Sequence, residues 1–531
     1  MRASKLVRLA LALSLLLALL PAPPVGAAPD AWSSLAAGID FQIFHLASPR
    51  PINLFIARLQ RSQTAATIDT AIAHGALGSG RETVSEMAAR ADGAINYWGE
   101  TWGNRNRAVV AINGYFFNLS SGEPLSGQAL SGWYAKRFSE YVGDAGFAWG
   151  LDRSAFIGKC VYHQPINQFL TVRRSGEIRK INAVNQSRGA DEVVMYTPQY
   201  GASTQTNSDG VEVLVEMSRP TLVLPEPAMA LGTVVRLRDG LGNTPIPFDH
   251  VVLSAAGTAR TALLDKLQKG DEIGISQEIS NCPGSPAKNW TKVYATTGGD
   301  YHFLTNGELT IDPSNPDAGV PNSRTAVAYS AAYVYFVVVD GWNRGVSEGI
   351  SVAEMGRFLR DTLSATDAVT LDSGGSSTMV VNGQVVNNTY CNFTRNCGMR
   401  PEHAPLRPGP DAAQGPALEP LVGNALLMVA VEPKLQAPRY AAGQEVFTLR
   451  NTELRLGPGT SYAVTANLTA GAQGSILSMQ YRDLNGIMAN GVYWQRAEFG
   501  STRGWIKRDD LYATNLLPGA TPGQYLPLVG H

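Results

Sequence analysis

Charged residues are scarce in this chain, and no basic block follows its first eight residues. Only 16% of the 531 residues are charged, and 43 Lys and Arg nearly balance 44 Asp and Glu, which gives a formal net charge of -1. Proteins that bind nucleic acid carry a basic patch that meets the phosphates. The composition therefore predicts no nucleic-acid partner, and a hydrophobic content of 44% suits two or three globular domains.

Metal-binding patterns are also missing. The sequence has four cysteines and seven histidines, with no C-x-x-C and no histidine at ligand spacing, whereas zinc sites need several such ligands close together. We expect no metal and no cofactor. The cysteines fit disulfides in an oxidising compartment. Cys391 and Cys397 bracket a short loop and are the favoured pair, which leaves Cys160 for Cys282.

Long apolar runs are absent after the N-terminus. A basic start is followed by an apolar run over residues 6–20, then by prolines and small residues that end at Ala27 and Ala28. This order is typical of a signal peptide, predicted over residues 1–28. No later segment approaches the length that spans a bilayer. We therefore expect an exported protein, secreted or at the cell surface, with no membrane span after the signal is removed.

Two apolar strands that run straight into an aspartate are the most informative positive feature. Residues 333–339 end at Asp340, and residues 368–371 end at Asp372. Apolar β-formers followed by a carboxylate and glycine are a common way to build a site at a strand end. A tight turn after a core strand is the other interpretation of either aspartate.

Glycines and hydroxyl groups follow Asp372, and a third strand end carries similar chemistry. Glycine lets the backbone approach a ligand, and successive N–H groups form a nest for an anion. The residues of this turn are Gly374, Gly375, Ser376 and Ser377. The strand over residues 108–112 stops at Asn113, where a hairpin turn in front of an aromatic cluster is the alternative.

The pattern along the chain predicts an α+β fold with a mixed sheet, followed by a small β-barrel. Capping boxes start two helices, at Thr83 with Glu86 and at Ser351 with Glu354. Residues 401–420 are rich in Pro, Ala and Gly and suggest a surface loop. The predicted division is a signal peptide at 1–28, a main domain at 29–432, a linker at 433–443, a β module at 444–515 and a flexible tail at 516–531.

The C-terminal module resembles a bacterial SH3-type domain. The pattern L-R-x-G-P-G-T-S-Y ends at Tyr462, and G-W-I around Trp505 would close the barrel. The resemblance implies binding of cell-wall peptides or glycans, with Trp494, Trp505 and Tyr512 in a groove. A place in the barrel core is the alternative for these rings.

The larger region resembles the phosphodiester glycosidase family, which includes N-acetylglucosamine-1-phosphodiester α-N-acetylglucosaminidase. The similarity covers most of residues 38–431, and the order of the motifs makes it specific. The motifs are 81–86, 111–117, 297–299, 323–326, 339–341, 347–351 and 371–377. Two positions depart from the family pattern: Ser373 replaces the first of three glycines, and Tyr115 replaces a glycine of the asparagine motif.

The resemblance implies hydrolysis of a sugar-1-phosphodiester at the anomeric carbon, which releases free sugar. Phosphate leaves readily, so the site needs a cation for the phosphate and a carboxylate near the anomeric centre more than a strong acid. Arg324 is the expected phosphate clamp. Asp372 is the leading carboxylate and Asp340 the second, and Glu354 is a further catalytic candidate whose capping role is the alternative. Residues expected to contact substrate are Asn113, Gly298, Gly299, Ser347, Gly374, Gly375, Ser376 and Ser377.

Two other functions compete with this hypothesis. A non-catalytic cell-wall or glycan-binding protein would use the SH3-like module as an anchor, although the joint presence of Asn113, Arg324, Asp340 and Asp372 favours catalysis. A metal-dependent phosphodiesterase is disfavoured because no His/Asp ligand set occurs. The expected substrates are phosphodiester-linked sugars in envelope or extracellular glycans.

Overall fold

The computed structural model describes eleven stretches of the chain. They are residues 31–91, 105–139, 145–217, 232–281, 293–312, 314–315, 318–391, 418–432, 439–478, 486–489 and 492–513. The predicted signal peptide, Cys282, Cys397 and most of the predicted loop at 401–420 lie outside these residues, so these predictions stay open. Cys160 and Cys391 are buried, and the described part of the chain contains no free cysteine. None of the helices described is both long and apolar enough to cross a membrane.

The fold is mostly β, so the predicted α+β class with a mixed sheet is wrong. The described residues contain three α-helices, α2 (Val84–Ala91), α3 (Gly257–Lys266) and α4 (Val352–Leu363), against several large sheets. The strand pairs are antiparallel except for one short pair at a sheet edge. The capping boxes at Thr83 and Ser351 do start real helices. Most strands, however, are paired antiparallel, and a parallel sheet would need crossover helices.

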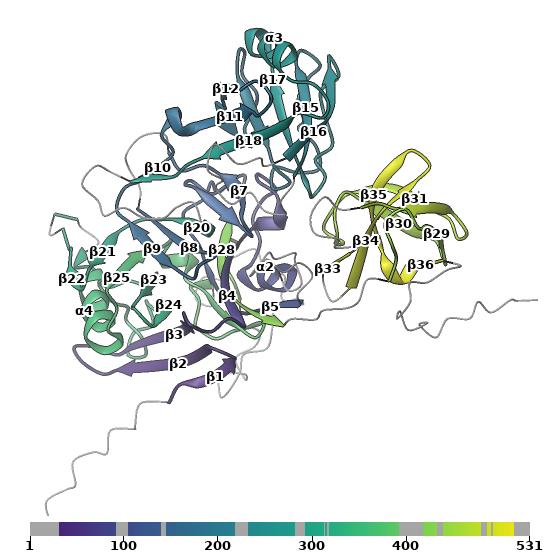
Figure 1. Ribbon diagram of the computed structural model, residues 1–531. Coiled ribbons are helices and arrows are strands. Elements are labelled where there is room, and N and C mark those ends of the chain that lie inside the picture. Colours follow the sequence, from purple (N-terminus) through teal and green to yellow (C-terminus); the bar gives the residue numbers. More distant parts are fainter. Residues whose placement is uncertain are drawn as a thin grey trace, which may run out of the picture.

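Three sheets form the main body (Figure 1). The first has the order β1 (Ser33–Ala36), β2 (Ile39–Leu46), β3 (Ile52–Gln60), β24 (Tyr333–Val339), β23 (Arg324–Tyr329), β25 (Asp367–Thr370), β21 (His302–Thr305) and β22 (Glu308–Leu309). The second has the order β27 (Gln384–Val385), β26 (Met379–Val381), β5 (Arg105–Asn113), β28 (Asn424–Glu432) and β4 (Ala66–Ile72). The third has the order β7 (Trp133–Lys136), β6 (Gln128–Leu130), β20 (Val293–Gly299), β8 (Ala145–Gly150) and β9 (Ala155–Gly158).

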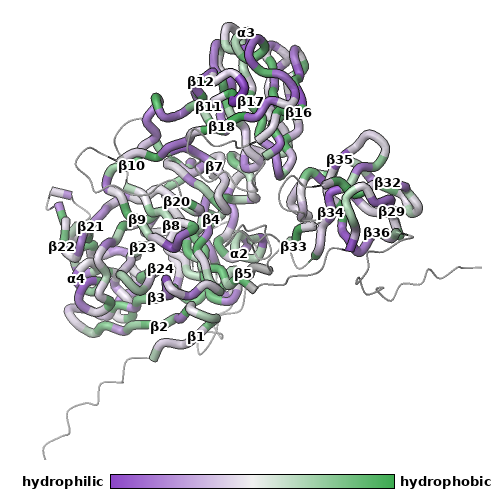
Figure 2. Tube along the Cα trace, in the orientation of Figure 1, coloured by the Kyte–Doolittle hydropathy of each residue, from purple (hydrophilic) through white to green (hydrophobic). Residues whose placement is uncertain are grey.

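One hydrophobic core joins these three sheets. Phe336 of β24, Val110 of β5 and Phe147 of β8 belong to the same buried cluster. The opposite face of β24 packs toward α4, where Val337 contributes to a second cluster with Met355. Because both faces of this strand are covered, its sequence is a continuous apolar run instead of alternating with polar residues. Figure 2 shows apolar colour along the strands of this body.

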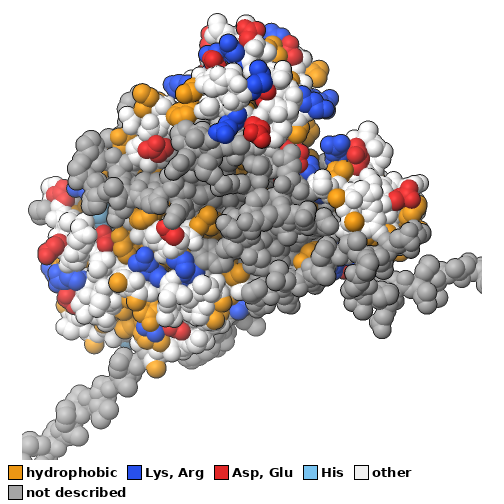
Figure 3. Space-filling view, in the orientation of Figure 1, with side chains coloured by type: hydrophobic (Ala, Val, Ile, Leu, Met, Phe, Trp, Pro, Cys, Tyr) orange, Lys and Arg blue, Asp and Glu red, His pale blue; other side chains and the backbone are white. Residues whose placement is uncertain are grey.

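A fourth sheet lies within the stretch predicted as one domain. Its order is β12 (Glu177–Lys180), β11 (Gln168–Val172), β18 (Glu272–Gln277), β16 (Gly232–Asp239), β15 (Val211–Met217), β17 (His250–Ala255), β14 (Val193–Tyr196) and β13 (Ala183–Val184). In the sequence, the short paired strands β10 (Val161–Tyr162) and β19 (Ser280–Asn281) lie between the strands of this sheet and those of the main body. This sheet contributes most of a separate buried cluster. On the face in Figure 3, acidic and basic side chains are interspersed over its α3 end.

The C-terminal module is a separate antiparallel β unit. Its sheet has the order β31 (Val464–Leu468), β30 (Thr452–Arg455), β35 (Thr502–Lys507), β34 (Val492–Phe499), β32 (Gln473–Ile476), β29 (Glu445–Thr448) and β36 (Leu511–Tyr512), and β33 (Ile487–Ala489) pairs with β34. Trp494 and Trp505 are each 1% exposed, so they belong to the core, whereas Tyr512 is 40% exposed and stacks on Phe447. Both tryptophan rings belong to a buried cluster shared with the main body, although Trp494 also lines a hollow of the module.

The module packs against the fourth sheet through a buried ion pair. Arg496 of β34 lies 2.5 Å from Glu216 of β15 and 3.5 Å from Asp249, and all three side chains are nearly buried. The backbone N–H of Phe248 donates to the carbonyl of Leu456 at 3.0 Å. The ring of Phe248 also contacts the ring of Trp505 edge to face. This interface fixes the module to the rest of the protein.

Replacing Arg496 with alanine tests this interface. The substitution leaves the carboxylates of Glu216 and Asp249 buried without their cation, and breaking such a pair costs about 3 kcal/mol. We expect a lower urea midpoint and faster proteolysis around the module. Arg503→Ala, which removes an exposed pair with Glu498, serves as the control and should leave both readouts near wild type. Equal behaviour of the two variants would contradict the buried pair.

Candidate active site

Four strand ends from three sheets meet at one place in the main body. The backbone N–H of Asp372, just after β25, donates to the carbonyl of Gly114, just after β5, at 3.0 Å. The N–H of Asp300, just after β20, donates to the carbonyl of Thr370 at 2.9 Å. The start of β23 joins them through Ser323, whose hydroxyl donates to the Gly374 carbonyl at 2.7 Å. Two of the three strand ends singled out from the sequence, at Asn113 and Asp372, thus meet at this junction.

The side chain of Asn113 holds this junction together. Its Nδ2 donates to the Asp372 carbonyl at 2.6 Å, and its Oδ1 accepts from the Thr325 hydroxyl at 2.8 Å and from the Thr378 backbone N–H at 3.1 Å. The residue is fully buried. Because both ends of the amide are used by the protein, this geometry favours a positioning role for Asn113 over contact with a sugar.

Asp372 is the carboxylate with the most perturbed environment at this junction. It is 9% exposed, and the Ser376 hydroxyl donates to its Oδ2 at 2.7 Å. Burial raises its pKa to about 6, and the nearby charge of Asp300 adds to that effect, while the hydrogen bond from Ser376 opposes it. A carboxyl group with a pKa near neutral can exchange protons at physiological pH, as general acids and bases do.

Asp300 is the residue that the sequence reasoning missed. Its carboxylate is close enough to Asp372 to raise the pKa of that group. The prediction used the motif Thr297–Gly299 and stopped one residue short. The missed signal is the same one that identified Asp372, because the apolar strand β20 also runs through glycine into an aspartate.

Asp340 is a buried brace. Its Oδ1 and Oδ2 each accept the backbone N–H of Asn388 at 3.0 Å, and Asn387 Nδ2 donates to Oδ1 at 3.1 Å. It is 4% exposed. The carboxylate therefore ties the loop after β24 to the segment after β27. These hydrogen bonds give the aspartate at the end of this second strand a structural role.

Arg324 and Glu354, the other two catalytic candidates, both have structural partners. Arg324 is 5% exposed, and its guanidinium donates to the carbonyl of Val320 at 3.0 Å and, at 3.4 Å, to that of Ile350. Glu354 caps α4 with Ser351 and pairs with Arg50, whose Nη2 lies 2.5 Å away. Burial raises the pKa of Glu354, but the hydrogen bonds from Arg50 and Ser351 outweigh it and lower the pKa overall. These contacts favour the capping alternative for Glu354.

The predicted substrate-binding residues divide into packing and site-lining positions. A Cβ on Gly298 would lie 2.7 Å from Cδ1 of Tyr115, and one on Gly299 would lie 2.5 Å from Cγ2 of Val369, so both glycines allow close packing. Ser347 is buried and donates to the Asp340 carbonyl at 2.8 Å. Residues 374–377 form the turn that carries Ser376, and Gly374 has a φ of +68° that favours glycine.

Both departures from the family pattern have local roles. The Ser373 hydroxyl donates to the Leu371 carbonyl at 3.1 Å and accepts the Thr325 N–H at 3.3 Å, so it joins β23 to the end of β25. The ring of Tyr115 fills the space above Gly298. Its backbone is held by Asn424, whose Oδ1 accepts the Tyr115 N–H at 2.7 Å. Neither substitution disrupts the junction around Asp372.

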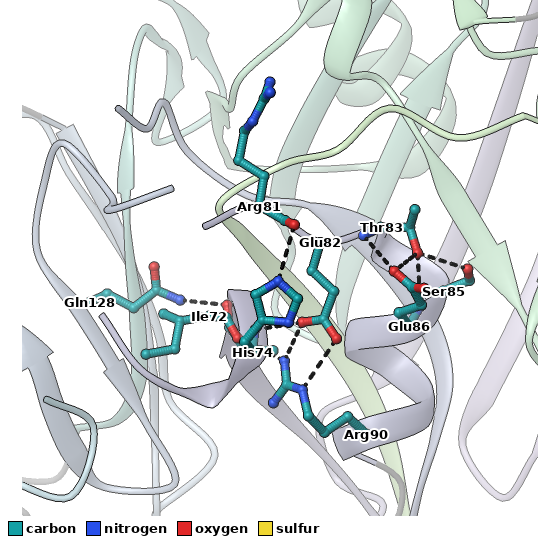
Figure 4. A network of polar contacts seen from close by, with 10 residues as sticks. Ile72, His74, Arg81, Glu82, Thr83, Ser85, Glu86, Arg90 and Gln128 are labelled. Atoms are coloured by element: carbon teal, nitrogen blue, oxygen red, sulfur yellow. Dashed lines mark hydrogen bonds and ion pairs between the residues drawn. The ribbon is translucent and has the colours of Figure 1, made fainter. Parts of the chain in front are cut away.

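The predicted motif at 81–86 starts α2 (Figure 4). Glu82 accepts the backbone N–H of His74 at 2.7 Å and pairs with Arg90 at 2.7 Å. Thr83 and Glu86 form the predicted capping box. In Figure 4 the side chain of Arg81 points away from this network. The motif thus shapes the start of the helix, with an exposed arginine beside it.

No group of three or more His, Cys, Asp or Glu side chains that could hold a metal ion occurs among the residues that the structure describes. The strongly perturbed acids elsewhere have evident structural partners. Burial raises the pKa of Asp69 to about 6, opposed by hydrogen bonds from Ser131. Burial likewise raises the pKa of Glu419 to about 7, where it accepts the Ser85 N–H at the start of α2.

One known protein family matches the part of the chain that contains this junction. The model of the NAGPA family, described as phosphodiester glycosidase, matches residues 232–400, which are 169 of the 531 residues. The match includes Asp300, Asp340 and Asp372, and it confirms the predicted resemblance of this region. The resemblance of the C-terminal module to an SH3-type domain stays a prediction.

Solved structures are more distantly similar. A Synechocystis protein is 18% identical with a TM-score of 0.48, and the match covers 76% of this chain and 64% of that one. A Burkholderia pseudomallei K96243 protein is 18% identical with a TM-score of 0.43, over 72% and 74% of the two chains. The catalytic domain of zebrafish N-acetylglucosamine-1-phosphodiester alpha-N-acetylglucosaminidase, auto-inhibited by its pro-peptide, is 12% identical with a TM-score of 0.35, over 77% and 87%. No curated protein matches the sequence.

The buried Asp372 makes stability depend on pH in a defined direction. In the unfolded chain it ionises near pH 3.8, and in the folded protein near pH 6. The folded state therefore holds the proton more tightly, and folding stability falls as pH rises between these values. At about 1.4 kcal/mol for each pH unit, the loss is about 3 kcal/mol.

Asp372→Asn removes this dependence, because the amide does not ionise. We expect the stability of the variant relative to wild type to increase between pH 4 and pH 6 and to stay constant above about pH 7, as measured by urea unfolding at each pH. Asp361→Asn, at an exposed pair with Arg360, is the control. A constant difference between wild type and Asp372→Asn across this range would contradict the raised pKa.

Proposed function

We propose that this protein is an exported hydrolase that cleaves sugar-1-phosphodiesters in envelope or extracellular glycans and releases free sugar. The observation that carries the proposal is the buried Asp372 at a junction of strand ends, inside the region that matches the phosphodiester glycosidase family. The resemblance of the first residues to a signal peptide supports export. The SH3-like pattern of the C-terminal module supports attachment to the cell wall.

Asp372 performs the chemical step in this proposal. Above about pH 6 its carboxylate is ionised, and it stabilises the positive charge that develops at the anomeric carbon and accepts a proton from the attacking water. The bond between the anomeric carbon and the phosphate oxygen breaks, and the phosphomonoester leaves with its electron pair. Burial makes the charge effective because little water competes with it.

Neighbouring groups position the Asp372 carboxylate and affect its pKa. Asn113 fixes the backbone of Asp372, and Ser376 orients its Oδ2. Burial raises the pKa of Asp372 to about 6, and the charge of Asp300 adds to this effect. The glycine turn at 374–375 follows Asp372 directly, and Gly374 has a φ of +68° that favours glycine. Together these features support a role for Asp372 in contact with substrate.

The C-terminal module has two surface features that suit its proposed anchoring role. A hollow is lined by charged and polar side chains, among them Arg450, Glu453 and Lys507. The exposed ring of Tyr512 stacks on Phe447. Cell-wall peptides carry both charges and apolar groups, so these surfaces support the proposed binding of such material.

A panel of sugar-1-phosphodiesters tests the enzymatic proposal. We expect the mature protein to release reducing sugar from at least one member, and Asp372→Asn to lose that activity by about 10³-fold or more, with unchanged folding and no effect of a chelator. No release across the panel, with retained binding to cell-wall material, would instead support the glycan-binding alternative. Loss of activity on chelation would support a metal-dependent phosphodiesterase.

The pH dependence of kcat/KM is a second test. Because catalysis needs ionised Asp372, activity should rise through about pH 6. Asp300→Asn removes a neighbouring negative charge, lowers the pKa of Asp372 and shifts this rise to lower pH. Asp312→Asn, at an exposed aspartate of another loop, should leave it in place. A profile that Asp300→Asn does not move would contradict the coupling of the two carboxylates.

A further inference from the structure

Two exposed aromatic rings lie against the glycine turn that follows Asp372. Trp342 is 45% exposed and Tyr390 is 40% exposed, and their ring centroids lie 4.7 Å apart with planes at 65°. A Cβ on Gly374 would lie 3.5 Å from Cη2 of Trp342, and one on Gly375 would lie 3.6 Å from Cδ1 of Tyr390. Each ring therefore contacts a different glycine of the same turn.

The backbone of Trp342 is held in a costly conformation. Its φ is +58°, which is unfavourable for a bulky residue and occurs mainly where the surroundings enforce it. The neighbouring loop supplies that constraint, since the Asn343 N–H donates to the Ser347 carbonyl at 3.0 Å. Residues with a strained backbone cluster at active sites and ligand contacts. The indole of Trp342 is only about half buried, so its packing within the protein offsets little of the strain.

Asp340 fixes the distance between the two rings. Trp342 follows Asp340 by two residues, and Tyr390 follows Asn388 by two residues. The carboxylate of Asp340 accepts the Asn388 N–H and the side-chain amide of Asn387. A buried carboxylate is costly unless it is hydrogen-bonded, and these hydrogen bonds join the loop after β24 to the segment after β27. The aromatic pair is therefore organised before any ligand arrives.

We propose that Trp342 and Tyr390 form a platform that binds the sugar ring of the substrate beside Asp372. This inference rests on the proposed function and names the residues that hold its sugar. One face of a pyranose ring presents C–H groups, whose partial positive charge is attracted to the electron-rich face of an aromatic ring. The planes of the two aromatic rings lie at 65°, so a pyranose ring that stacks on one of them also contacts the other. The turn that the two rings lie against follows Asp372 directly in the chain.

The platform is tested with substitutions that remove one ring and keep the fold. Trp342→Gly removes the indole and suits a φ of +58°, so relief of the backbone strain offsets part of the stability lost with the ring, and the variant should remain folded. Trp342→Phe keeps an aromatic face. Leu241→Ala, at an exposed apolar side chain in the loop after β16, is the control for loss of an exposed apolar side chain elsewhere.

Binding is measured by calorimetry in the Asp372→Asn background, so that no turnover interferes. The probes are the methyl phosphodiesters of glucose 1-phosphate and N-acetylglucosamine 1-phosphate, and dimethyl phosphate, which has no sugar ring. We expect Trp342→Gly to weaken binding of at least one sugar probe about 10-fold or more, as loss of stacking does. Trp342→Phe and Leu241→Ala should bind nearly as the parent does, and dimethyl phosphate should not distinguish the variants.

Kinetics with Asp372 intact separate binding from chemistry. We expect Trp342→Gly to raise KM with little change in kcat, because the platform contacts the sugar equally in the ground and transition states. Unchanged Kd and KM in folded Trp342→Gly would overturn the platform and leave the enzymatic proposal standing. Sugar binding that depends on Trp342, without turnover by the wild-type protein on any diester, would support the platform and overturn the enzymatic proposal.

Discussion

The amide side chain of Asn113 is the contact on which the candidate site depends. It lies where β5 ends, and it binds groups from the start of β23 and from both sides of the Asp372 turn. These segments are far apart in the sequence and belong to two sheets that share one core. An amide can donate and accept at the same time, which a hydroxyl or carboxylate in its place could not do with the same geometry. Asp372 therefore has a fixed backbone position at a place where three sheets meet.

The three aspartates at strand ends have different surroundings and therefore different roles. Asp340 is surrounded by N–H donors and stabilises two loops. Burial raises the pKa of Asp372 to about 6, the nearby negative charge of Asp300 adds to this effect, and the hydrogen bond from the Ser376 hydroxyl opposes it. Asp300 is more exposed and supplies that charge. Similar sequence patterns thus lead to different chemistry, because the number of donors around each carboxylate differs.

Local sequence patterns predicted where these strands end, but they did not predict which residues contact the strand ends. The strands before Asp340 and Asp372 and the caps of α2 and α4 follow from local patterns of apolar, glycine and capping residues, and the structure confirms them. Which donors surround Asp340, and which carboxylate lies beside Asp372, depends on contacts between segments far apart in the chain. The α+β prediction failed for a related reason: two clear helix signals said nothing about how the many short strands pair.

The proposed reaction takes place at the anomeric carbon, and the position of bond cleavage tests this proposal directly. Hydrolysis of an active sugar-1-phosphodiester in water enriched with ¹⁸O, followed by mass spectrometry of both products, identifies which atom the water attacks. Attack at the anomeric carbon, as Asp372 would promote, places the label in the released sugar and leaves the phosphomonoester unlabelled. Label in the phosphomonoester would mean that the bond between phosphorus and oxygen breaks, and it would contradict the assignment of this site to a glycosidase.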